Sequence, residues 1–244
     1  MPVQVVDNPA ALEFLGQVLA VAPREELEAI AVEVEHKSQR MREIVGDDPT
    51  SLDRAAVREL LGWVFCTRRR VDQVLAVVSD DELATGIGQL LTGSAPLPQR
   101  YDAFRDLLLD LPDVAADLPG ELLHFVDPGR HWLWTRWIWD AEADTGALRL
   151  VTTDEVDLDA DTPGESYLAV GAAMAMLEEN GKAAGFTSMG SGLFGTDVFL
   201  AAVYGVYMST VLGMRLSQEF TRVMPPLPGL VRRLLGVHVP ARRS

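Results

Sequence analysis

The chain has few residues suited to nucleophilic or acid–base chemistry. Its 244 residues include one cysteine, Cys66, and four histidines. A lone cysteine cannot form an intramolecular disulfide, and its place in the apolar run WVFC is typical of a buried thiol. No G-x-S-x-G elbow is present to activate a serine. We therefore predict no catalytic residue, no metal and no cofactor, while an enzyme stays open as an alternative.

Basic residues are also few. The chain has 21 Lys and Arg against 36 Asp and Glu, for a formal net charge of -15. Such a charge repels nucleic-acid phosphates and anionic lipid headgroups, so we expect neither nucleic-acid nor membrane partners. The start of the chain lacks the basic and apolar regions of a secretion signal. These features indicate a soluble cytoplasmic protein.

Long hydrophobic runs are missing as well. The uncharged stretch 166–177 is too short to cross a hydrocarbon core, and the stretch 198–214 is at the lower limit. The mean hydropathy is only +0.10. We predict that both stretches are central helices of a globular core.

Helix signals are abundant. Asp7 precedes an amphipathic stretch that stops before Pro23, residues 24–45 follow a helical period and end at Gly46, and Ser79 with Glu82 forms a capping-box pattern. We predict a mainly α, multi-helix globular bundle with two central apolar helices. It forms a single helical domain over residues 1–244, with an N-terminal lobe of about residues 1–95 and a C-terminal lobe of about residues 96–244.

One strand signal stands out from this helical pattern. The segments RWIWD and ALRLVTT flank the turn-rich AEADTG, with Trp137 and Trp139 in alternation. Alternating apolar residues on either side of a turn are typical of a β-hairpin. We predict a small β-hairpin near residues 136–152.

Most of the aromatic surface is concentrated in one segment. Four of the five tryptophans, Trp132, Trp134, Trp137 and Trp139, lie within HWLWTRWIWD. So much aromatic surface belongs in a core, an interface or a ligand pocket. The polar neighbours His131, Arg136 and Asp140 are the groups that could orient a ligand there.

Two glycine-containing patterns follow later in the chain. Small residues recur every fourth position at Ala201, Gly205, Ser209 and Gly213, which lets another backbone approach one helical face closely. The spacing of Gly190, Gly192 and Gly195 matches G-x-G-x-x-G and allows an anion-binding loop. A dinucleotide fold would need a strand before this loop, and none is expected, so a plain helix-to-helix loop is the favoured interpretation.

Two metal-binding patterns can also be traced. Glu33 with His36 and Glu121 with His124 repeat a Glu-x-x-His spacing, but His36 points away from the apolar face of its helix. We therefore expect surface charge for the first pair and a buried, hydrogen-bonded His124. The alternating acids Asp157, Asp159 and Asp161 lack the glycine and the final glutamate of a calcium loop.

The preferred interpretation is a non-catalytic interaction or accessory protein. It would self-associate or dock a protein partner through a surface made of the aromatic segment and the small-residue helix (Trp132, Trp134, Arg136, Trp137, Trp139, Gly205, Ser209, Gly213). The alternative is an enzyme or carrier that binds an apolar small molecule in a pocket of the C-terminal half, with the Gly190 to Gly195 loop as an anion seat.

Overall fold

The computed structural model describes residues 5–185, 192–215 and 225–237. Within these ranges the chain forms ten α-helices, one short 3-10 helix and no sheet, which confirms the prediction of a mainly α protein. The bounds are α1 (Asn8–Val21), α2 (Arg24–Val45), η1 (Pro49–Ser51), α3 (Arg54–Trp63), α4 (Val71–Val77), α5 (Asp80–Thr92), α6 (Leu97–Asp106), α7 (Pro112–Val126), α8 (Pro163–Ala184), α9 (Gly195–Arg215) and α11 (Leu227–Leu234).

Local capping signals set several helix ends. The Asp7 carboxylate accepts a hydrogen bond from the Ala10 N–H at the start of α1, and Ser79 with Glu82 forms a complete capping box at the start of α5. Gly46 ends α2 with a positive φ of 65°, a conformation that favours glycine. These ends were predictable because each depends on residues within one turn.

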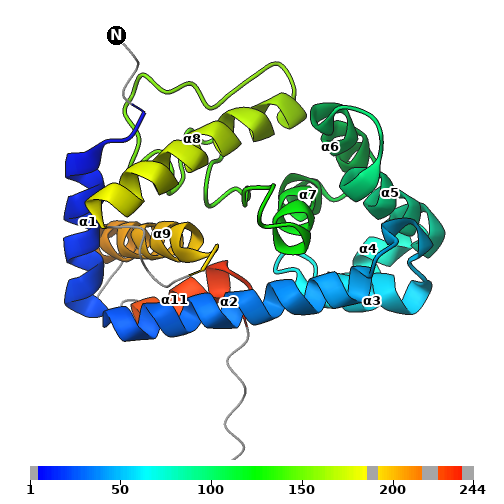
Figure 1. The fold of residues 1–244 in the computed structure, drawn as a ribbon, viewed down its shortest axis with the longest axis horizontal. Coiled ribbons are helices and arrows are strands. Elements are labelled where there is room, and N and C mark those ends of the chain that lie inside the picture. The colour runs from blue at the N-terminus through cyan, green and yellow to red at the C-terminus, as the bar shows by residue number, and fades with distance from the viewer. Residues whose placement is uncertain (1–4, 186–191, 216–224, 238–244) are drawn as a thin grey trace, which may run out of the picture.

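The helices surround a shared interior (Figure 1). Helix α2 runs along one side of the molecule and packs against α3, α7, α9 and α11, while α8 crosses the opposite side and packs against α6 and α9. Helices α1 and α2 from the first part of the chain therefore contact α9 from the second part. The division into two lobes near residue 95 stays a prediction.

The predicted β-hairpin at 136–152 is wrong, since no strand forms in the described part of the chain. In the described part of the chain one isolated antiparallel bridge, between Asp140 and Thr145, joins the two arms, and the Ala147 and Leu148 N–H groups donate to the Trp137 and Ile138 carbonyl oxygens. Beyond it the second arm coils into turns, because the Leu150 and Val151 N–H groups bond to Ala147 and Leu148 three residues earlier. The tryptophans alternate in the sequence because each contacts a different neighbour in the fold. The alternation does not come from a pleated β-ladder.

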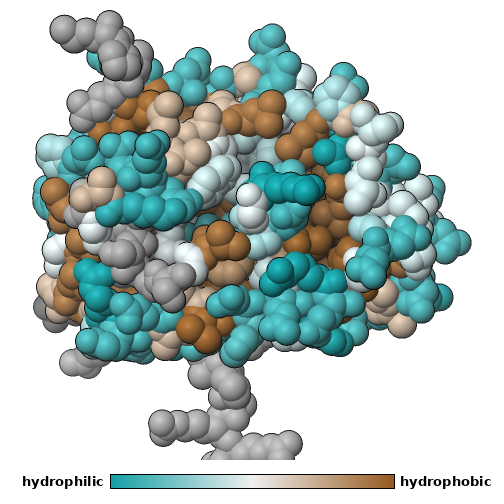
Figure 2. All heavy atoms as spheres, viewed as in Figure 1, coloured by the Kyte–Doolittle hydropathy of each residue, from teal (hydrophilic) through white to brown (hydrophobic). Residues whose placement is uncertain are grey.

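The surface is mostly polar on the face shown in Figure 2, with apolar side chains gathered along α8. Leu168 and Met176 of that helix are 48% and 46% exposed. Over the described residues, none of the helices has the length and hydropathy needed to cross a membrane.

A candidate ligand pocket beside the tryptophan segment

The tryptophan segment is anchored on α7 at Gly120. A methyl group on Gly120 would overlap the carbonyl oxygen of Trp134, so the segment's backbone lies directly on the helix at this position. The four indoles then diverge. Trp132 contacts Gly171 of α8, and Trp137 lies against Tyr204 of α9 with 6.2 Å between ring centroids.

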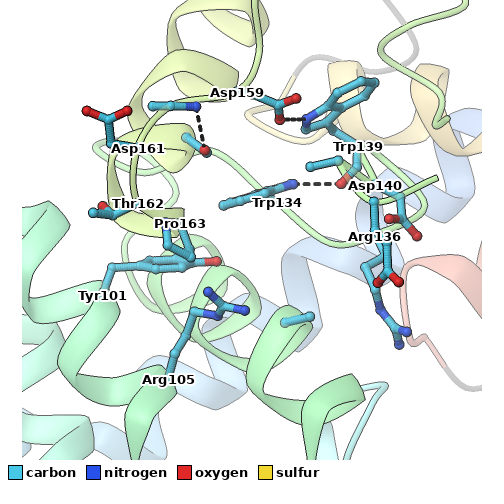
Figure 3. A pocket seen from close by; sticks show the side chains of 15 residues that line it. Tyr101, Arg105, Trp134, Arg136, Trp139, Asp140, Asp159, Asp161, Thr162 and Pro163 are labelled. Carbon is cyan, nitrogen blue, oxygen red and sulfur yellow. Dashed lines mark hydrogen bonds between the residues drawn. The ribbon is translucent and has the colours of Figure 1, made fainter. Parts of the chain in front are cut away.

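Trp134 and Trp139 border a cavity of about 410 Å³, which lies between the tryptophan segment, α6 and the start of α8 (Figure 3). This volume lies within the range of small-molecule pockets. We call this cavity the aromatic pocket. Its lining also includes Tyr101, Arg105, Arg136, Asp140, Glu142, Asp159, Asp161, Thr162, Pro163 and Ser166.

Hydrogen bonds hold the two indoles of the aromatic pocket in place. The Trp134 Nε1–H donates to the Trp139 carbonyl oxygen at 2.9 Å, and the Trp139 Nε1–H donates to Asp159 Oδ1 at 3.1 Å. Figure 3 shows Trp134 lying across the cavity between these partners. Because both indole donors are used within the chain, the rings offer only their apolar surfaces to the cavity.

Tyr101 of α6 supplies the third aromatic side chain. Its ring lies 5.8 Å from the Trp134 ring and 4.9 Å from the Tyr167 ring, and these two rings lie 6.3 Å from each other, so the three form one aromatic cluster. Its hydroxyl is fully buried and has no hydrogen-bond partner among the described residues. Burial raises the pKa of Tyr101 well above its ordinary value, so the hydroxyl keeps its proton and can both donate and accept.

Carboxylates outnumber cationic groups around the aromatic pocket. Four carboxylates line it, from Asp140, Glu142, Asp159 and Asp161, against the guanidinium groups of Arg105 and Arg136.

Arg136 is already paired outside the aromatic pocket. Its Nη1 lies 2.6 Å from Asp113, and its Nη2 lies 3.1 Å from Asp117. The hydrogen bond to Asp117 and the charges of both aspartates raise the pKa of Arg136. In Figure 3 its head group points away from Trp134, which leaves Arg105 as the cation that faces the cavity.

His131 lies outside this lining. Its side chain is half-buried, and burial lowers its pKa. Its backbone carbonyl instead accepts a hydrogen bond from Nδ1 of His124 at 2.8 Å. Of the three polar groups suggested by the sequence, the structure places Arg136 and Asp140 at the aromatic pocket.

The first half of the small-residue face of α9, at Ala201 and Gly205, is covered by the chain itself. A Cβ atom on Gly205 would lie 2.5 Å from Cδ1 of Leu227 in α11, so α11 is the close neighbour that the stripe accommodates. Ala201 is fully buried, whereas Ser209 is exposed and bonds back to the Gly205 carbonyl. Gly213 lies in α9, and nothing further is described of its surroundings.

The predicted anion loop is described only in part. Gly190 lies outside the described residues, Gly192 is exposed, and Gly195 is the first residue of α9. The anion seat stays a prediction.

Three of the four residues in the two Glu-x-x-His pairs form ion pairs with other residues. Glu33 binds Arg232 of α11, and His36 is exposed. Glu121 binds Lys37, and His124 binds Asp197, with all four of these side chains buried. Across residues 5–185, 192–215 and 225–237, no group of three or more His, Cys, Asp or Glu is placed to hold a metal ion.

Sequence reasoning missed Tyr101 and Arg105, which line the aromatic pocket from α6. These two side chains reach the aromatic pocket because the first residues of α8 pack against α6. The Gly164 N–H donates to Asp102 there at 2.8 Å. Sequence reasoning considered Asp159 and Asp161 only as members of an incomplete calcium-loop pattern. No local signal connects these positions to the tryptophans.

No family model matches the chain, and neither a curated protein nor a solved structure matches it significantly.

Proposed function

We propose that the protein is a non-catalytic binding protein that holds a small organic cation in the aromatic pocket. The observation that carries the proposal is the combination of fixed indole surfaces and an excess of carboxylates around one cavity. An ammonium group is attracted by carboxylates and by aromatic faces, and the apolar body of the ligand gains from contact with the rings. The aromatic pocket suits an amine with an apolar body.

The other end of the ligand would meet Arg105. Its guanidinium group can donate a hydrogen bond, so an oxygen atom on the ligand fits this side of the aromatic pocket. The proposal refines the small-molecule alternative drawn from the sequence.

A titration with amines and their neutral counterparts tests this proposal. Tyramine, phenethylamine and choline would be compared by calorimetry with an alcohol or hydrocarbon of matched shape, such as tyrosol for tyramine. We expect at least one amine to bind more tightly than its counterpart. We also expect Asp161→Asn to weaken that binding, while Glu155→Gln, in the same acidic segment but outside the aromatic pocket lining, leaves it unchanged. Equal binding of every matched pair would refute the proposal.

A second candidate is self-association through the exposed face of α8. Leu168, Ala172 and Met176 are exposed on this helix, and residues 166–177 carry no charge. Two copies with a net charge of -15 each repel one another. This repulsion is weakest where the contact is made through an uncharged apolar face. This surface, rather than the covered Gly205 face, supports the interaction role.

The mass of the protein in solution tests self-association. We expect light scattering to show a dimer that Leu168→Glu converts to a monomer without loss of thermal stability. Leu109→Glu is a matched control, since Leu109 is also exposed but lies away from α8. A monomer for the unmodified chain at every concentration would exclude this role.

The cytoplasm stays the proposed compartment. Its support in the structure is Cys66, which is buried as a free thiol.

A further inference from the structure

Three consecutive arginines border a second cavity. Arg68, Arg69 and Arg70 lie in the turns between α3 and α4, which we call the arginine loop (residues 64–70). A cavity of about 590 Å³ separates this loop from α11 and from the start of the tryptophan segment. Its lining residues are Phe65, Cys66, Arg68, Arg69, Arg70, Asp117, Arg136 and Arg233. We call it the arginine cavity.

Buried polar contacts fix the arginine loop. The Glu121 carboxylate accepts the backbone N–H groups of Phe65 at 3.1 Å and Cys66 at 3.4 Å. It also binds Lys37 Nζ at 3.2 Å, and Lys37 donates to the Leu235 carbonyl at the end of α11 at 3.0 Å. One buried carboxylate thus connects the loop with α2, α7 and α11.

Gly236 brings α11 close to the arginine loop. Its φ is +69°, a conformation that other residues rarely adopt, and a Cβ atom there would lie 2.8 Å from Lys37 Nζ and 3.1 Å from Phe65 Cβ. Arg233, three residues earlier, lines the arginine cavity together with Arg69. Buried contacts therefore fix the backbone segments that carry these two exposed side chains.

The positive charge in the arginine cavity is only partly balanced. Five guanidinium groups line it, and Asp117 is the one lining carboxylate, already bound to Arg136. Asp113 lies 3.8 Å from Arg70 and also binds Arg136.

The remaining arginines lie close to one another. Neither Arg69 nor Arg233 forms an ion pair with any described residue. Arg68 stacks on Phe65 at 4.9 Å, and its pKa is lowered by burial and by the charges of Arg69 and Arg233. Arg69 and Arg233 thus add positive charge to the same cavity lining as Arg68, in a chain that has 36 acidic residues. Such an arrangement costs repulsion energy, which a bound anion would remove.

We infer that the arginine cavity binds a small anion that carries a phosphate or pyrophosphate group. Guanidinium groups form paired hydrogen bonds with phosphate oxygens, and several of them converging on one cavity match a multiply charged anion. The volume suits a small phosphorylated molecule. Because the molecule as a whole is strongly acidic, a long nucleic acid is repelled outside the arginine cavity.

This inference does not depend on the organic-cation proposal. Arg136 lines both cavities and would confuse a test, so the experiment uses Arg69 and Arg233. Arg130 provides a matched control, because its side chain is 82% exposed and lies outside both linings.

Calorimetric titration with inorganic pyrophosphate, at constant ionic strength set with sodium chloride, is the test. We expect one site per chain, and we expect Arg69→Gln and Arg233→Gln each to weaken binding about tenfold or more. Arg130→Gln should change it less than about twofold. No saturable binding, or an equal loss in all three variants, would overturn the inference.

Thermal melting without added anion separates this inference from a structural role. If the arginines serve an anion, Arg69→Gln and Arg233→Gln melt at or above the temperature of the unmodified protein, because repulsion is relieved. If they hold the fold together, both variants melt lower, and the inference fails.

Discussion

Lys37 Nζ lies 3.2 Å from Glu121 Oε2, and the two side chains are only 1% and 4% exposed. The ammonium group also lies 3.7 Å from the centroid of the Phe125 ring, so burial is compensated by an ion pair, a carbonyl and an aromatic face. Burial lowers the pKa of Lys37, and the Glu121 charge opposes that shift. This pair joins α2 to α7 and fixes the arginine loop.

Removal of one member of this pair should be costly. We expect Glu121→Leu to lower the free energy of unfolding by about 3–5 kcal/mol, because it leaves the Lys37 ammonium buried without its carboxylate. The double variant Lys37→Met with Glu121→Leu should be more stable than Glu121→Leu alone. Urea denaturation measures both values.

An exposed lysine is the control for this prediction. Lys182 pairs with Glu178 one turn earlier on α8 and is 69% exposed, so Lys182→Met should cost less than about 1 kcal/mol. If the loss in the double variant equals the sum of the losses in Glu121→Leu and in Lys37→Met measured alone, the buried pair contributes no coupling.

His124 predicts a specific dependence of stability on pH. Its Nδ1 faces the His131 carbonyl at 2.8 Å and its Nε2 faces Asp197 Oδ2 at 3.0 Å. Both partners can accept, so both ring nitrogens donate when the ring is protonated. Burial lowers the pKa of His124, but the Asp197 charge and the two hydrogen bonds outweigh burial and raise it.

The direction of the pH dependence follows from the raised pKa of His124. Protonation of His124 favours the folded state, so its contribution is complete below the unfolded-state pKa of about 6.5 and is lost as pH rises through the higher folded-state pKa. We expect His124→Gln to remove this part of the decline in unfolding free energy above about pH 6.5. His36→Gln, on an exposed histidine, should retain it. Identical pH profiles for the unmodified protein and His124→Gln would contradict the assignment.

Local and long-range interactions differed in how far the sequence could predict them. The ends of α1, α2 and α5 depend on Asp7, Gly46 and Ser79, whose partners lie within a few residues. The failed hairpin depended on alternation of Trp137 and Trp139, which the chain uses for contacts with Tyr204 and Asp159. Periodicity shows that a side chain is buried, but it does not name the neighbour.

The candidate site shows the same limit. The sequence pointed to Trp134, Arg136 and Trp139 at the aromatic pocket, because an aromatic cluster with polar neighbours is visible locally. It could not point to Tyr101, which arrives through the packing of α6 on α8. The arginine loop carried a visible signal, three adjacent arginines, but its meaning depends on Arg233 across the cavity.

Gly120 should be intolerant of any side chain. A methyl group there would overlap the Trp134 backbone, so Gly120→Ala should lower the free energy of unfolding by about 3 kcal/mol and shift the tryptophan fluorescence. Gly16, in the interior of α1, has open space around it, so Gly16→Ala should instead raise stability by about 0.5–1 kcal/mol. Equal effects of the two substitutions would show that the tryptophan segment does not rest on α7 at this position.

Gly205 distinguishes an internal role of the small-residue face from a role in assembly. A leucine at this position would have to displace Leu227, so Gly205→Leu should lower the free energy of unfolding by about 1–3 kcal/mol through overpacking between α9 and α11. Its mass in solution should equal that of the unmodified protein, because the face is already covered by α11. Gly62→Leu, at a helical glycine with open space around it, should cost less. Chemical denaturation together with light scattering separates the two roles. A change of mass without a loss of stability would show that Gly205 contacts a second molecule and that α11 is not its main neighbour in solution.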